Sequence, residues 1–376
     1  MPQIAGFRGI LWDTKVELAK LVKSELVRDP TRAIYRYHQA FPAGSRTLVR
    51  KSFFAAIALA PWTDGLVRPH ELTDPKERDA TLAAIASSGL HTDAVLAGFH
   101  DAAGEVDRLF RKAESERPIV EVTTPDGTDH KLWRVQSAEV IGKLRPLFAP
   151  KKLHVLDGHA RYEAMVAYRD QLGAKAPLSM YSSANYGLAC LVNLDDPALA
   201  VGARHRIVRG ANVTRDVALD MARAYFIIEK LPGAAKLPAK HFAALADTVA
   251  HQPAFIAIFP GDADAWKLTL SPDVSPVAAG VVVPKAIQKY DPVVVERLFL
   301  GKLAPGLTSE TTIDPAAVIA AVDGGADLGI VMRPLTVAQI THADELGALL
   351  PIGSTAFVPP IARLVGYVVD PDEDVV

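Results

Sequence analysis

The stretch that decides the fold is KLHVLDGHARYE, residues 152–163. Residues 152–156 are mostly apolar and predict a short strand, Asp157 and Gly158 predict a tight turn, and residues 160–172 predict a helix that Gly173 closes. A strand that enters a helix through a glycine turn directs free backbone N–H groups at one point, where the helix dipole adds positive potential. The sequence therefore predicts an anion-binding turn.

His159 and Arg161 flank this turn and are the side chains that bear on the choice of ligand. A cation at a helix N-terminus is unfavourable by about 0.3–1 kcal/mol. An anion such as phosphate between the two side chains would offset that cost. The alternative is a plain helix start, with Asp157 as the N-cap and Arg161 paired with Glu163 or another surface acid. The spacing leaves both interpretations open.

The rest of the chain predicts an α+β (mixed α/β) fold. Two hairpins are expected because aromatic and β-branched runs flank turn residues, 42–45 in the first hairpin and 125–127 in the second. We expect a domain boundary near residue 210, which gives two domains, 1–210 and 211–376. The expected strands are 34–41, 47–59, 119–123, 130–135, 186–193, 254–259, 265–270 and 328–332, and the expected helices are 15–29, 75–87, 137–144, 216–231, 314–322 and 336–349.

Composition excludes several classes of protein. The chain has 376 residues, a net charge of −2 and a single cysteine. The charge argues against a nucleic-acid binder, and the lone Cys190 excludes an internal disulfide and a multi-cysteine metal site. The longest nearly apolar stretch, residues 53–62, is half of the about twenty residues that a membrane span needs. With no signal peptide recognised at the start, we expect a soluble cytoplasmic protein.

The stretch LDGHARYEA, residues 156–164, resembles the DGHHR signature of the bacterial domain of unknown function 1015 family. The archaeal free serine kinases carry a similar signature, and both resemble the ParB/sulfiredoxin superfamily, whose equivalent turn binds nucleotide phosphates. Residues 168–170, 191–197 and 205–209 look similar to the flanks of that family. The signature departs at Ala160, where the family has a second histidine.

This resemblance implies a ParB/sulfiredoxin-like core with an added N-terminal hairpin region, followed by a C-terminal α/β domain. It also implies that four residues of the turn bind a nucleotide phosphate: Asp157, Gly158, His159 and Arg161.

The stretch VRPHELT, residues 67–73, resembles the LPHE-x-T motif of the same family. The resemblance implies that Glu71 is a catalytic carboxylate with His70 beside it. Phosphoryl transfer to a hydroxyl needs such a group, because the hydroxyl proton must be accepted as the new bond forms. The alternative is that Glu71 belongs to a surface loop and that Thr73 caps a helix starting at Pro75.

The stretch LPIGSTAFVPP, residues 350–360, resembles the family motif PQKSTYFYPK. Ser354 and Thr355 are retained and are expected to line the substrate pocket, but Gly353 and Pro360 stand where the family has lysines. The alternative is a hydroxyl-stabilised turn that only closes a loop. The family's N-terminal PPYDV stretch is missing.

Together these motifs predict a nucleotide-dependent kinase that transfers a phosphoryl group to a small hydroxylated amino acid, free L-serine being the acceptor that the resemblance implies. ATP or ADP with Mg²⁺ would be required. The alternative is a non-catalytic ParB-like nucleotide-binding regulator, which the changes at Ala160, Gly353 and Pro360 favour. The sequence does not identify the nucleotide, the acceptor, the metal ligands, the oligomeric state or the pathway.

Overall fold

The structure is a computed structural model that describes residues 4–11, 27–43, 46–210, 213–249, 252–304, 307 and 309–375. Most of the helix predicted over residues 15–29 lies outside this part of the chain. Its last three residues are described, and they are not helical.

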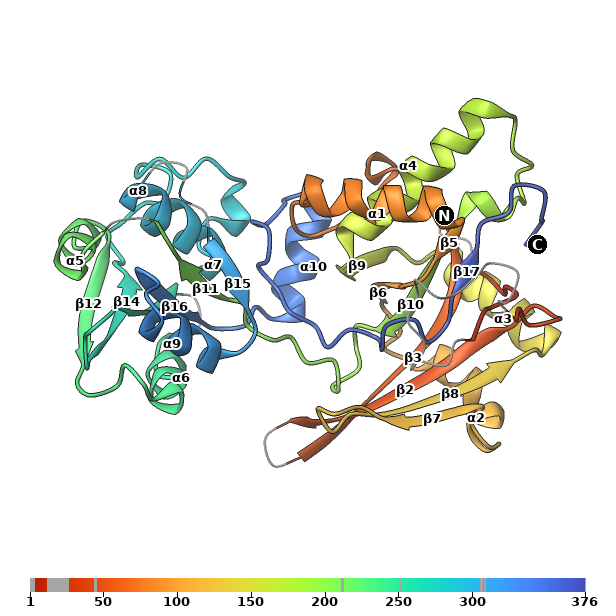
Figure 1. The fold of residues 1–376 in the computed structure, drawn as a ribbon, viewed down its shortest axis with the longest axis horizontal. Coiled ribbons are helices and arrows are strands. Elements are labelled where there is room, and N and C mark those ends of the chain that lie inside the picture. The colour runs from red at the N-terminus through yellow and green to blue at the C-terminus, as the bar shows by residue number, and fades with distance from the viewer. Residues whose placement is uncertain are drawn as a thin grey trace. The chain divides into compact units, whose positions relative to one another are not determined.

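The chain divides into two compact units, and each mixes helices and strands, which confirms the predicted α+β class (Figure 1). Unit 1 comprises residues 1–69, 73–200 and 358–376. Unit 2 comprises residues 70–72 and 201–357. The division into domains 1–210 and 211–376 stays a prediction.

Unit 1 is built on a nine-stranded sheet in the order β4-β9-β6-β10-β3-β2-β8-β7, with β1 paired to β3. The bounds are β1 Ile4–Ala5, β2 Ile34–Ala43, β3 Arg46–Ala58, β4 Val67–Pro69, β6 Val95–Phe99, β7 Val120–Thr123, β8 Asp129–Val135, β9 Leu153–Asp157 and β10 Tyr186–Asn193. A separate two-stranded sheet joins β5 Leu90–His91 to β17 Tyr367–Val368.

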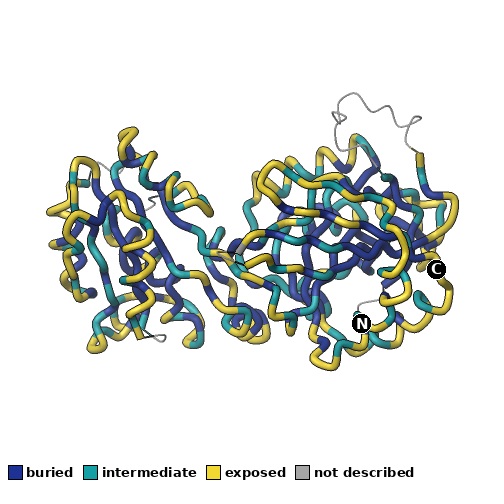
Figure 2. The backbone as a smooth tube through the Cα atoms, turned by 90° about the horizontal axis from the view of Figure 1, so that it is seen from below, coloured by how far each residue is buried: buried dark blue, intermediate teal, exposed yellow. Residues whose placement is uncertain are grey.

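Both predicted hairpins are present in this sheet, β2 with β3 and β7 with β8. Residues 52–57 of β3 are all buried, and Phe53, Ala55 and Ile57 belong to the hydrophobic core of unit 1. The central strand β10 is buried along most of its length. Figure 2 shows the buried parts of the chain in dark blue. Cys190 lies within β10 as a fully buried residue.

The helices of unit 1 are α1 Pro75–Ser88, α2 Glu105–Glu114, α3 Ala138–Phe148 and α4 His159–Lys175. Ser137 caps α3 by accepting a hydrogen bond from the Val140 backbone N–H. Two local expectations are wrong. Asp74, not Thr73, caps α1 by accepting a hydrogen bond from the Lys76 backbone N–H. Gly173 does not end α4, because the helix continues to Lys175.

Unit 2 is built on a six-stranded sheet in the order β12-β14-β13-β16-β11-β15. The strands are β11 His205–Val208, β12 Phe226–Leu231, β13 Ala254–Ile258, β14 Ala265–Leu270, β15 Ser309–Thr312 and β16 Leu328–Met332. The helices are α5 Arg215–Ala222, α6 Pro238–Ala246, α7 Asp291–Val294, α8 Gly301–Leu303, α9 Pro315–Asp323 and α10 Val337–Glu345, with a π-helical segment at Val295–Leu300.

The helix predicted over residues 216–231 is wrong in its second half. The helix ends at Ala222, and residues 226–231 form β12, which pairs antiparallel with β14. The Phe-Ile-Ile run at 226–228 is typical of a strand, and this local preference decides against continuing an alanine-rich helix.

Within the described residues, no helix combines the length and apolar character that crossing a membrane requires.

Candidate functional site

Two neighbouring strands of unit 1 end at the same edge of the sheet. Strands β4 and β9 are parallel, and Pro69 is in register with Val155. Beyond β4 the chain continues with the Pro-His-Glu motif, and beyond β9 it continues with the Gly158 turn. Since parallel neighbours leave a sheet on one side, both motifs begin at the same edge.

The turn after β9 has the geometry of an anion-binding site. Gly158 adopts the left-handed conformation (φ 90°, ψ 35°) and is the N-cap of α4. The first N–H groups of a helix have no partners within it, so α4 presents donors at this turn. The predicted strand, turn and helix are therefore all present.

Arg161 is held against the turn by an ion pair within it. Its Nη2 lies 2.5 Å from Asp157 Oδ2. Asp157 ends β9 and is not the N-cap, so the alternative of a plain helix start is wrong in that detail. Its other detail, a pairing of Arg161 with Glu163 or another acid, is met by Asp157. The Arg161 Nε–H is buried and has no hydrogen-bond partner among the described residues. A buried donor of this kind favours an acceptor brought by a ligand.

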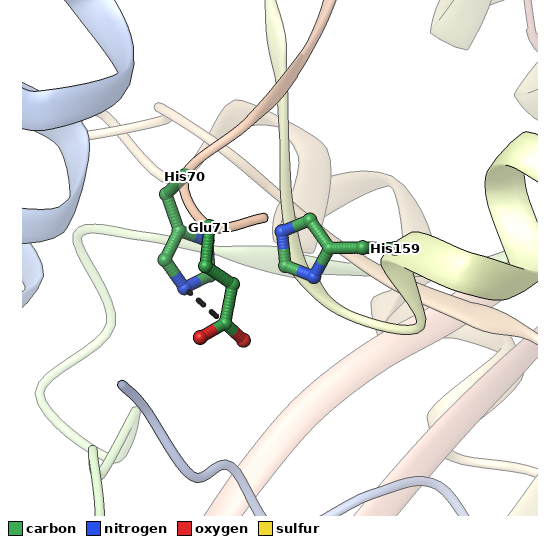
Figure 3. A group of neighbouring side chains, drawn as sticks. All are labelled: His70, Glu71 and His159. Atoms are coloured by element: carbon green, nitrogen blue, oxygen red, sulfur yellow. Dashed lines mark ion pairs between the residues drawn. The ribbon is translucent and has the colours of Figure 1, made fainter. Parts of the chain in front are cut away.

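Neighbouring residues fix the start of α4. His159, its first residue, is buried and drawn in Figure 3, and Ala160 is also buried. The Tyr162 hydroxyl donates to the Ala60 carbonyl at 2.8 Å and accepts from the Ala60 N–H at 3.0 Å. Glu163 accepts hydrogen bonds from Trp62 Nε1 and from the Thr73 hydroxyl, each at 2.8 Å. Thr73 therefore ties its segment to α4 and leaves the capping of α1 to Asp74.

Residues 70–72 of the first motif and residues 350–355 of the C-terminal motif meet inside unit 2. The Glu71 carboxylate accepts the Ser354 backbone N–H at 2.7 Å through Oε2. His70 Nε2 lies 2.8 Å from Thr355 Oγ1 and 3.9 Å from Glu71 Oε1, the pair marked in Figure 3. Backbone hydrogen bonds between residues 70–72 and Leu350 add to these contacts. The Glu71 side chain is only 12% exposed, which argues against a freely solvated loop carboxylate.

The hydroxyls of the C-terminal motif are engaged in this arrangement. Ser354 Oγ donates to the Pro351 carbonyl at 2.6 Å, which is the turn contact considered as the alternative. Thr355 Oγ1 contacts His70. Direct contacts of Ser354 and Thr355 with a substrate stay a prediction.

Two arginines hold the same segment, and sequence reasoning did not single them out. Arg206 is fully buried; it donates to the Gly353 carbonyl at 2.9 Å and pairs with Glu296 at 2.7 Å. Arg204 Nε donates to the Thr355 carbonyl at 2.6 Å. The similarity of residues 205–209 to the family was the only signal for Arg206.

Gly353, which replaces a family lysine, has a backbone that disfavours a side chain. Its φ is +67°, and a Cβ there would lie 3.0 Å from Thr311 Cγ2. The local backbone conformation therefore favours glycine over lysine at this position.

These features define a mixed α/β protein in which a glycine turn and a carboxylate motif follow the ends of two adjacent strands. The chain belongs to the family described as "Protein of unknown function (DUF1015)", whose model matches residues 14–291. The resemblance seen in the sequence is thereby confirmed for the family. The C-terminal motif at 350–360 lies outside the matched residues.

Comparison with solved structures finds chains that are similar over most of their length but at low identity. A conserved hypothetical protein from Pyrococcus furiosus has 12% identity and a TM-score of 0.40, covering 84% of this chain and 93% of its own. A free serine kinase in complex with AMP has 14% identity and a TM-score of 0.40, covering 83% and 88%. A mutant free serine kinase in complex with ADP has 12% identity and a TM-score of 0.42, covering 83% and 89%. No curated protein matches the sequence.

Proposed function

We propose that the protein is a nucleotide-dependent phosphotransferase that acts on the hydroxyl of a small amino acid, with L-serine as the acceptor implied by the motif resemblance. One observation carries the proposal. The parallel strands β4 and β9 are neighbours, and the motif implied to supply the base and the motif implied to bind phosphate follow directly from their ends.

The phosphate-binding role falls to the turn at residues 157–161. Backbone donors at the start of α4 and the unpartnered Nε–H of Arg161 both suit phosphate oxygens. Asp157 supplies the carboxylate oxygen that Mg²⁺ prefers, and the ion would neutralise phosphate charge when bound there. His159 stays a proposed contact of the nucleotide, from its position as the first residue of the helix.

The proposed base is Glu71. As the acceptor hydroxyl oxygen forms a bond to the transferred phosphorus and the bond to the nucleotide breaks, Glu71 takes the hydroxyl proton. The Ser354 N–H fixes one carboxylate oxygen at 2.7 Å and so restricts the orientation of the group. His70, held by Thr355, acts as a positioning residue beside Glu71.

Phosphorus NMR tests this proposal on the purified protein with Mg²⁺, ATP or ADP, and L-serine. We expect a phosphoserine signal whose rate of appearance falls about 10²–10⁴-fold in Glu71→Gln. The glutamine amide oxygen can still accept the Ser354 N–H, so the fold is expected to survive. Calorimetric titration should show unchanged nucleotide affinity in this variant. Absence of product with the wild-type protein, or equal activity of the variant, would overturn the kinase assignment.

A non-catalytic nucleotide-binding protein is the second candidate, and the C-terminal motif favours it. Gly353 and Pro360 replace both family lysines, and the backbone at Gly353 disfavours a side chain. Nucleotide binding without product in the experiment above would support this second candidate.

A further inference from the structure

A cavity of about 490 Å³ lies in unit 1 beside α1 and is not part of the motifs described above. Its walls are largely apolar, with Ala80, Ala84 and Ile85 from α1 and Met165 from α4. Two polar side chains with unpartnered atoms, His91 and Arg161, also line it. Its volume falls within the range of small-molecule sites, about 300–1,000 Å³.

His91 lines this cavity and carries an unused hydrogen-bond donor. Its side chain is buried, and its ring stacks on Tyr367 with 5.4 Å between centroids and 15° between planes. The Leu188 backbone N–H points at His91 Nδ1 from 3.4 Å, so Nδ1 is the accepting nitrogen. Burial lowers the pKa of His91 to about 3, which keeps the ring neutral. The single ring proton therefore lies on Nε2.

This Nε2–H has no partner among the described residues. An unsatisfied buried donor costs about 1–3 kcal/mol, and a ligand acceptor at this position would remove the cost. The acceptor that fits is a neutral one. The donor at His91 is uncharged, and the walls that α1 contributes beside it are mainly apolar, which suits a neutral acceptor.

Arg161 connects this cavity to the phosphate-binding turn. It lines the cavity and it also pairs with Asp157 at the start of α4. A ligand with a neutral, flat, acceptor-bearing group in the cavity and a phosphate at the turn would use both unpartnered donors.

We propose that the cavity between α1 and α4 holds the base of the bound nucleotide, with His91 Nε2–H donating to a ring nitrogen or carbonyl oxygen of that base. The inference rests on the proposed nucleotide-dependent function and assigns the place of the base within it. His91 then acts as a specificity-determining residue, because it selects bases that offer an acceptor at this point.

A second cavity, of about 590 Å³, competes for the same role because Arg161 lines it too. Its most buried ring, His130, already has both nitrogens engaged, Nδ1 with the Tyr37 hydroxyl at 2.6 Å and Nε2 with Thr124 Oγ1 at 3.0 Å. It therefore lacks the unused ring donor that marks the first cavity.

Two exposed alanines allow a matched test, since Ala84 lines the first cavity and Ala362 lines the second. We expect Ala84→Phe to weaken ADP binding by about tenfold or more, equivalent to about 1.4 kcal/mol, in a calorimetric titration with Mg²⁺. Ala362→Phe should bind ADP like the wild type. Inorganic pyrophosphate, which probes only the turn, should bind equally to both variants.

The outcomes separate this inference from the proposed function. If ADP binds Ala84→Phe as well as the wild type, or if Ala362→Phe is the variant that loses it, the base lies elsewhere and nucleotide binding still stands. If the wild type binds neither ADP nor pyrophosphate, the proposed function fails and takes this inference with it.

Modified nucleotides test the hydrogen bond of His91 itself. One of the 1-, 3- or 7-deaza forms of ADP should bind the wild type about two- to tenfold more weakly than ADP, as expected for one lost neutral hydrogen bond. His91→Phe, which keeps a ring to stack on Tyr367, should bind ADP and that analogue equally. An analogue penalty that persists in His91→Phe would overturn the role of His91.

Discussion

Gly158 is the single backbone position on which the proposed phosphate-binding turn depends most. Its φ is +90°, and an added Cβ would lie 2.7 Å from Arg161 Nε and Nη2. Gly158→Ala should therefore cost about 1–2 kcal/mol of unfolding free energy and displace the guanidinium, which weakens nucleotide binding. Urea unfolding and calorimetric titration of the variant measure the two effects.

Gly173 of the same helix supplies the control for this prediction. It lies inside α4, and a Cβ there would meet only Leu178 Cδ1 at an ordinary 3.8 Å. Gly173→Ala should leave binding unchanged and stabilise the protein by up to about 1 kcal/mol through helix propensity. Equal behaviour of the two variants would contradict the special conformation assigned to Gly158.

The residues of the candidate site were predictable in kind, but their partners were not. The turn and the Pro-His-Glu motif could be recognised locally, because each is a short continuous stretch. The contacts of Glu71 with Ser354 and of His70 with Thr355 join positions more than 280 residues apart. A local sequence pattern therefore cannot predict them. One alternative paired Arg161 with Glu163 or another surface acid. The acid is Asp157, and Glu163 accepts hydrogen bonds from Trp62 and Thr73.

The N-terminus of α1 allows a prediction at the scale of one element. Asp74 Oδ1 accepts the Lys76 N–H at 2.9 Å and satisfies one of the free donors of the first turn. Asp74→Ala should lower the free energy of unfolding by about 1 kcal/mol in urea titrations. The control is Asp79→Ala on the same helix. The exposed Asp79 carboxylate pairs only with neighbouring Arg78 among the described contacts. This substitution should change the free energy of unfolding by less than about 0.5 kcal/mol. A loss of equal size in both variants would exclude a capping role for Asp74.

Helices and strands could be predicted where one pattern of apolar residues continued along the segment. They could not be predicted where the pattern changed within a segment or where the segment was too short to show one. The hairpins β2–β3 and β7–β8 and the strands β10, β13, β14 and β16 have continuous apolar or β-branched runs, and all were predicted. The segment 216–231 changes from helix to strand after Ala222, and its strand pairs with β14 some forty residues later in the chain. Strands of two or three residues, such as β4 and β5, have no period to detect, and long-range pairing alone creates them.

At the scale of the whole molecule, each unit contains a buried histidine whose Nδ1 accepts a backbone N–H. Leu188 donates to His91 in unit 1, and Met332 donates to His205 in unit 2 at 3.1 Å. Protonating either Nδ1 would place two N–H groups against each other inside a core. Burial accordingly lowers the pKa of His91 to about 3 and that of His205 to about 4, from an ordinary 6.5.

These shifts set the direction of an acid sensitivity. Between the folded and unfolded pKa values the unfolded chain binds more protons, so stability is complete above pH 6.5 and falls as the pH drops below it. At pH 5 each histidine should account for a loss of about 2 kcal/mol. Glu114 does not interfere in this range. The effect of burial on Glu114 is outweighed by His38 and Arg36, which lower its pKa to about 2. The stabilisation that Glu114 contributes is therefore lost only as the pH falls below its ordinary pKa of 4.5.

Urea titrations at pH 7, 6 and 5 test the prediction in the wild type and in His91→Phe with His205→Phe. The double variant is expected to be less stable at pH 7, since two backbone donors lose their acceptors, but to lose less on acidification. The difference between pH 7 and pH 5 is the decisive quantity, because it cancels the cost of the lost hydrogen bonds. A double variant that loses as much stability as the wild type over this range would show that other groups take up the protons. Single variants then assign the effect to one unit or the other, because each histidine lies in the core of its own unit.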